Sequence, residues 1–151
     1  MTDRSELSLT VEDHDKAFTE VCFLLEVLVN ALGELVGKST PTLGVTAGRH
    51  MGKKLPIYLT DPDVETVLKA IAERMASGWG MEIKADGKGA DVKFGKCAIR
   101  DVCKNRSLEL GGELCQMFHY YLSGMAAELY GKPVRATIKS AGDSCDTRMD
   151  S

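Results

Sequence analysis

Four of the five cysteines lie in the C-terminal half of the chain, and their thiols could bind a metal ion. They are Cys97, Cys103, Cys115 and Cys145. Thiolates bind Zn(II), iron and iron–sulfur clusters, and in a reducing compartment cysteines are seldom paired in disulfides. The spacing contains no CxxC pair, which is the usual mark of a zinc finger. The alternative is that each cysteine is a small buried hydrophobic residue, as free cysteines commonly are.

His119 follows Cys115 by four residues within a segment of helical periodicity. Side chains four apart emerge on one helix face a turn apart, so the imidazole could be a further metal ligand. A hydrogen-bonded histidine is the alternative. Nucleophilic catalysis by this pair is not favoured, because the sequence has no GxSxG or HExxH motif. We therefore predict no catalytic residues and do not favour an enzyme.

Apolar residues at steps of three and four predict the helices that would position these side chains. The third helix is expected to be capped by Thr60 or Asp61, with Pro62 in its first turn. Gly131 is expected to end the last helix. The predicted helices cover residues 13–36, 42–54, 60–77 and 107–130.

The first two helices carry distinct patterns. We predict that the first is a core helix, with Cys22 buried on it as an apolar residue. Gly44, Gly48 and Gly52 recur at intervals of four on the second helix, which lets another backbone approach that face closely. The predicted core stripe of the first helix consists of Phe18, Val21, Leu25, Leu28, Leu32 and Leu35.

Alternating apolar and polar residues predict two hairpins, over 81–94 and 134–150. Residues 97–106 are less regular and are predicted to be a strand end and a loop. The grouping of elements predicts an α+β fold, with N-terminal helices packed on an antiparallel sheet of two hairpins and a long helix between them. No linker is visible, so residues 1–151 are predicted to form one domain.

Composition argues against several function classes. A net charge of −3 without a basic run argues against nucleic-acid binding. The initial residues, MTDRSELSLTVEDHD, do not have the pattern of a signal peptide, and no apolar run reaches the roughly 20 residues of a membrane span. We expect a cytoplasmic protein with no membrane span.

The segment CQMFHYYLSGMAAELYGKPVRATIKSAGDSC, residues 115–145, resembles the 4-vinyl reductase domain family. These are small-molecule-binding domains of the hydrocarbon-binding and phenol-sensor kind, similar in fold to small TRAPP vesicle-tethering subunits. The similar pattern is a cysteine opening a helix, small residues spaced by four, a helix-ending glycine, a strand, then Gly-Asp and a closing cysteine. Here these positions are Cys115, Gly124, Gly131, Gly142, Asp143 and Cys145. The earlier segment LGVTAGRHMGKKL also resembles a helix of the family.

The resemblance implies that Cys115 and Cys145 are metal ligands. Members with a zinc site commonly carry a Glu and another Cys on the strand before Gly-Asp, but the strand VRATIKSA has neither. Cys97 and Cys103 could complete a four-thiolate set, with His119 as a substitute. The cofactor would be Zn(II) or an iron–sulfur cluster, and the sequence does not distinguish them.

The resemblance further implies an apolar ligand pocket between the helices and the sheet. Aromatic and Met side chains at helical spacing are the candidates to line it, although such residues are also common in a plain core. The candidate residues are Trp79, Phe94, Met117, Phe118, Tyr121 and Met125.

Three functions follow as alternatives. The first is a small-molecule-binding or sensory domain for an apolar ligand, with a cysteine-ligated metal and a regulatory or redox partner protein. The second is an iron–sulfur or other redox protein whose metal centre is itself functional. The third is a scaffold or assembly subunit. Family members often dimerise through their early helices, and the glycine face of residues 44–52 and the apolar first helix would permit a homodimer.

Overall fold

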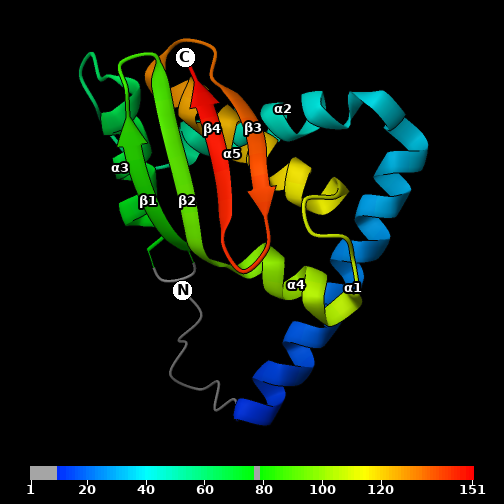
Figure 1. Ribbon diagram of the computed structural model, residues 1–151. Helices are drawn as coiled ribbons and strands as arrows, with labels where there is room; N and C mark the ends of the chain where they lie inside the picture. The colour runs from blue at the N-terminus through cyan, green and yellow to red at the C-terminus, as the bar shows by residue number, and fades with distance from the viewer. Residues whose placement is uncertain (1–9, 77–78) are drawn as a thin grey trace.

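The computed structural model describes residues 10–76 and 79–151, and it contains one antiparallel sheet with helices on a single face (Figure 1). The strands are β1 (Trp79–Ala85), β2 (Gly89–Cys97), β3 (Arg135–Ala141) and β4 (Cys145–Asp150). Their order is β1-β2-β4-β3, so the two predicted hairpins lie side by side and pair through β2 and β4. The predicted α+β class is confirmed.

The described part of the chain also contains six helical segments. They are α1 (Val11–Val36), the 3₁₀ turn η2 (Gly37–Ser39), α2 (Thr40–Lys54), α3 (Val64–Arg74), α4 (Ala98–Arg106) and α5 (Glu113–Tyr130). Helices α3 and α5 cover the inner face of the sheet, and α2 packs on α5. The core is apolar because alternate residues of β2 and β4, such as Val92, Phe94 and Met149, are buried against these helices.

Three sequence predictions about helix boundaries were wrong. The segment 97–106 is largely helical, since Val102 and Cys103 bury one face of α4 against α1 and α5. The last helix starts at Glu113, because the chain turns at Gly111, whose φ is +79°. The N-cap of α3 is Asp63, whose carboxylate accepts from the amide of Thr66 at 2.7 Å, so Pro62 precedes that helix.

The prediction that α1 is a core helix was also wrong. Only Cys22 and Val29 are buried on it, and α1 extends away from the sheet (Figure 1). Of the predicted core stripe, Phe18, Val21, Leu28 and Leu35 are exposed, and Leu25 and Leu32 are half-buried. Within residues 10–76 and 79–151, no helix combines the length and apolar character needed to cross a membrane.

The glycine face of α2 is occupied by α5 of the same chain, so it is not available for a dimer contact. Gly48 lies against the carbonyl of Tyr121, and Gly124 of α5 lies against the carbonyl of Val45. One turn before Gly48, Gly44 lies against Tyr120 of α5, and one turn after it Gly52 lies against Glu128. Close approach of two backbones was the predicted use of these glycines, and its partner is α5.

We expect Gly48→Ala and Gly124→Ala each to lower the free energy of unfolding by about 3 kcal/mol, because the added Cβ would clash with a backbone carbonyl. Urea unfolding followed by circular dichroism would measure the change. Gly33→Ala is the matched control. Its Cβ would meet only the flexible carboxylate of Glu113 at 3.3 Å, so it should be neutral or stabilising by up to about 1 kcal/mol. Equal stability of Gly48→Ala and Gly33→Ala would contradict the packing.

Candidate functional site

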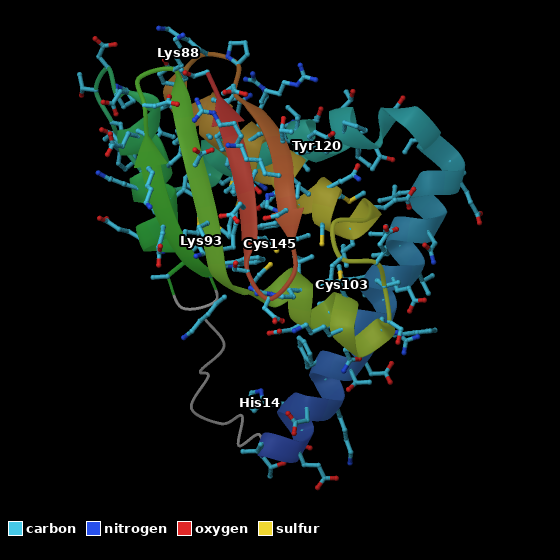
Figure 2. The ribbon with its side chains drawn as sticks, viewed as in Figure 1. His14, Lys88, Lys93, Cys103, Tyr120 and Cys145 are labelled. Carbon is cyan, nitrogen blue, oxygen red and sulfur yellow. The ribbon has the colours of Figure 1, made fainter. Side chains whose placement is uncertain are left out.

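The four candidate cysteines come from four positions that the fold brings to one end of the sheet. Cys97 ends β2 and is the N-cap of α4, Cys103 is on the buried face of α4, Cys115 is in the first turn of α5, and Cys145 begins β4. All four are buried. Figure 2 shows Cys145 and Cys103 toward the end of the sheet at which α4 begins.

Two of these thiols are direct neighbours. The Sγ atoms of Cys103 and Cys115 lie 3.8 Å apart in the interior. Burial raises the pKa of Cys103 well above its ordinary value, and the nearby thiols of Cys115, Cys97 and Cys145 raise it further. Burial is also the main cause of the raised pKa of Cys97, with smaller contributions from Cys145 and Cys115. Each of the four thiols is therefore within electrostatic range of the set.

The arrangement fits part of a tetrahedral metal site. A zinc ion bound by four thiolates at about 2.3 Å separates the sulfur atoms by about 3.8 Å, the spacing of Cys103 and Cys115. As the side chains stand, no three His, Cys, Asp or Glu residues of the described ranges 10–76 and 79–151 are close enough together to hold a metal ion. The chain thus presents one thiol pair at ligand spacing and two further thiols nearby.

Arg100 helps to position two of the cysteines, and sequence reasoning missed it. Its buried guanidinium donates to the carbonyls of Phe94 and Gly95 at 3.3 and 3.1 Å. It also donates to the carbonyl of Gly142 at 3.4 Å, in the turn before Cys145. The end of β2 and the β3–β4 turn are therefore tied together beside Cys97 and Cys145. From the sequence, this role of Arg100 could have been predicted only if residues 98–106 had been assigned to a helix.

Cys22 is buried, as predicted from the sequence. It packs in the apolar cluster that also contains Cys103 and Cys115. Neither thiol contributes to the raised pKa of Cys22, whose main cause is burial. Cys22 thus provides a buried cysteine close to the candidate site but outside the predicted ligand set.

His119 faces the sheet one turn beyond Cys115 and bonds to Thr147. Its Nδ1 lies 3.2 Å from the Thr147 hydroxyl, and its ring meets Phe94 and Phe118 edge to face, with centroids 5.2 and 5.4 Å away. Burial lowers the pKa of His119 to about 4, so the imidazole is neutral at pH 7. This is the geometry of a hydrogen-bonded core histidine, which was the alternative to a metal ligand.

The position of the ring proton of His119 depends on the direction of its bond to Thr147. If the Thr147 hydroxyl donates to Nδ1, Nε2 carries the ring proton; if it accepts, Nδ1 carries it. No protein atom of the described ranges accepts from Nε2. Because no buried side-chain nitrogen of those ranges lacks a partner, Nε2 keeps access to the pocket that His119 lines.

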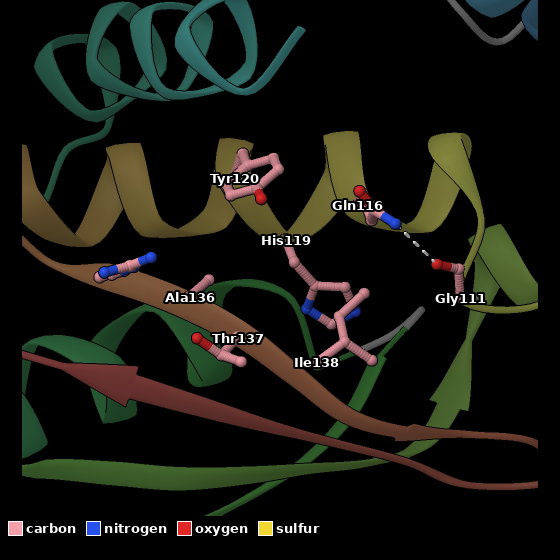
Figure 3. Close-up of a pocket in the computed structure, with 8 residues that line it drawn as sticks. Gly111, Gln116, His119, Tyr120, Ala136, Thr137 and Ile138 are labelled. Carbon is pink, nitrogen blue, oxygen red and sulfur yellow. Dashed lines mark hydrogen bonds between the residues drawn. The ribbon is translucent and has the colours of Figure 1, made fainter. Parts of the chain in front are cut away.

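This pocket of 370 Å³ lies between α5 and the edge strand β3. Figure 3 shows His119 of α5 pointing toward Ile138 of β3, and the Gln116 amide donates to the carbonyl of Gly111 at 3.2 Å. Tyr120 and Thr137 also line the pocket. Arg135 also lines it. Of these residues sequence reasoning had named only His119, because an edge-strand arginine carries no motif.

The predicted ligand-binding residues mostly pack against one another. Trp79 stacks on Phe118, with ring centroids 4.3 Å apart and planes 7° apart, and Phe94 meets Phe118 edge to face. Phe94, Phe118 and Met125 are buried in the core. Tyr121 packs beside them, and Met117 packs on the cluster that contains Cys115. Trp79 also borders a surface hollow, beside α3 and β1.

Comparison with known proteins gives no family assignment, since neither a protein-family model nor a curated protein matches the chain. The fold defines an α+β protein with a helix-covered antiparallel sheet. The similarity to the 4-vinyl reductase domain family stays a prediction.

His119 should make the folded protein less stable as the pH falls from 6.5 to 4. Above pH 6.5, the ordinary pKa of histidine, the imidazole is neutral in the folded and the unfolded chain. Below pH 6.5 the unfolded chain binds a proton on His119, whereas the folded chain binds it only near pH 4. We expect wild type to lose about 2 kcal/mol more than His119→Gln between pH 7 and 4.5, because one pKa unit is worth about 1.4 kcal/mol.

Urea unfolding at both pH values, with a chelator present so that metal loss does not contribute, measures this difference. His14→Gln replaces an exposed histidine of α1 and is the control, expected to keep the wild-type pH dependence. Identical pH dependence of wild type and His119→Gln would show that the buried imidazole does not carry the effect.

Proposed function

We propose that the protein is a small-molecule-binding or sensory domain, resembling the 4-vinyl reductase domain family, that holds a metal ion on Cys97, Cys103, Cys115 and Cys145. The observation that carries the proposal is the convergence of these buried thiols from separate elements, with Cys103 and Cys115 at 3.8 Å. Four thiols favour zinc, which prefers tetrahedral thiolate sites, and an iron–sulfur cluster is the alternative occupant.

A structural role for the metal is favoured over a redox role. A bound metal ion would join β2, α4, α5 and β4 at the place where they meet, with the ligand thiols deprotonated on binding. This reading fits a cytoplasmic location, where thiols stay reduced.

A sensory role gains support from α5, which carries both Cys115 and the pocket residues Gln116, His119 and Tyr120. A ligand in the pocket would contact the helix that also supplies a metal ligand. The signal would pass to a regulatory or redox partner protein.

Metal analysis and the visible absorption spectrum of protein purified without oxygen test the proposal. We expect stoichiometric zinc without colour in wild type, and almost none in Cys115→Ala and Cys145→Ala, because each loses a ligand. Cys22→Ala is the matched control, since it also removes a buried thiol but should retain the metal. A wild-type chain that neither carries nor takes up zinc or iron would refute the metal site, and a brown protein with iron and sulfide would favour the redox function.

The proposed homodimer would form through α1. Large apolar side chains are exposed along this helix, and exposed apolar patches of this kind commonly mark protein interfaces. They are Val11, Phe18, Val21, Phe23, Leu24, Val27, Leu28 and Leu35.

We expect wild type to have twice the chain mass of 16.4 kDa by light scattering, and Val21→Glu/Leu28→Glu to be monomeric because charge would be buried in the interface. Tyr58→Glu is the control, since it also replaces an exposed apolar side chain by glutamate, at a residue that is 91% exposed outside α1. A monomeric wild type at high concentration would exclude the dimer and leave α1 for another protein, as in the scaffold alternative.

A further inference from the structure

A second hollow adjoins the pocket beside His119 at Tyr120. The second hollow, of 330 Å³, is lined by Pro41 and Val45 of α2 and by Val134 before β3. Tyr120, Arg135 and Ala136 line both, so the two hollows are neighbours along the edge of β3. We name the pair the β3 groove. Its combined size is in the range of small-molecule sites, which is about 300–1,000 Å³.

The charges lining the β3 groove are all positive. Among the residues that the structure describes, no carboxylate lines either hollow, and the cations that do are Arg49 and Arg135. Arg49 forms an ion pair with Glu128 at 3.4 Å. Arg135 forms no ion pair within residues 10–76 and 79–151, although Asp150 is its register partner on β4, because Asp150 bonds to Arg148 at 2.8 Å. One arginine is therefore left to attract an anion.

Hydrogen-bond donors and apolar surface lie on opposite sides of Arg135. Toward α5 and the loop before it, His119 lines the groove, and its imidazole presents an Nε2 proton there when the Thr147 hydroxyl donates to Nδ1. Toward α2, the side chains of Pro41, Val45 and Val134 offer apolar contact. A ligand that fits both sides has an anionic, proton-accepting head and an apolar body.

We infer that the β3 groove binds a small organic carboxylate, with its carboxylate between Arg135 and His119 and its apolar body against Pro41 and Val45. This inference rests on the proposed small-molecule-binding function and specifies its site and ligand class. Guanidinium binds carboxylate through two parallel hydrogen bonds, which explains the choice of head group. A single free arginine beside a neutral histidine suits a monoanion, and Pro41, Val45 and Val134 add apolar contacts that an inorganic anion cannot use.

Isothermal titration calorimetry with 3-phenylpropionate tests the inference on the full chain. Its amide, 3-phenylpropanamide, has the same apolar body without the charge, and inorganic phosphate has charge without an apolar body. We expect 3-phenylpropionate to bind at least tenfold more tightly than either. Arg135→Gln changes an exposed side chain, so the fold should persist, and it should remove the preference for the acid over the amide.

Two further variants separate the groove from general charge attraction. Arg135→Lys should restore part of the affinity, because it returns the charge without the paired donors. Lys139→Gln removes a cation of the same strand that pairs with Asp91 outside the groove, and it should bind as wild type does. A His119→Gln chain that folds should bind the acid more weakly while the amide is unaffected.

Three outcomes would overturn the inference: no binding of the acid, equal binding of acid and amide, or phosphate binding with the same dependence on Arg135. Metal analysis of the same samples keeps the proposals apart. Zinc without acid binding would refute only the groove ligand, and acid binding to a metal-free chain would refute only the metal site. Equal binding of acid and amide would leave a small-molecule site for an apolar ligand.

Discussion

The close contact of α2 with α5 is the constraint on which the site depends. Gly48 and Gly124 let each helix meet a carbonyl of the other, so α5 cannot slide or rotate without a backbone clash. This contact fixes α5 relative to α2, and α5 in turn packs on the sheet through β3. His119 then meets Thr147 of β4. One helical turn rises about 5.4 Å and two strand residues about 6.6 Å, so Cys115 lies near the level of Cys145.

Local periodicity predicted most elements but not what covers them. The hairpins and the buried stripe of α3 were predicted because alternation and steps of three and four are properties of each segment alone. The apolar stripe of α1 has the same local signal as a core helix. Whether a second layer of the same chain covers it is a tertiary property, and here none covers most of it. The glycines of α2 likewise predicted a close approach without naming α5.

The candidate site likewise has residues that the sequence could predict and residues that it could not. The cysteines could be selected by residue type, and their convergence depends on α4, a short, largely polar helix that the sequence suggested was a loop. Arg135, Thr147 and Arg100 could not be selected, because an exposed arginine, a strand threonine and a helix arginine have no signature. Their roles arise from neighbours far along the chain. The aromatic candidates fill the core because Trp79 and Phe118 stack on each other.

The proposed metal ligands and the β3 groove share α5, which has a physical consequence if both are occupied. Cys115 and His119 are one turn apart on a helix that packs as a rigid element against α2. A ligand that shifts this helix relative to β3 would change the geometry of the thiols, and a metal that fixes Cys115 would change the groove. By linkage, the factor by which metal alters ligand affinity equals the factor by which ligand alters metal affinity. If α5 neither moves nor changes its flexibility, only the electrostatic attraction between the metal ion and an anionic ligand remains to couple the two sites.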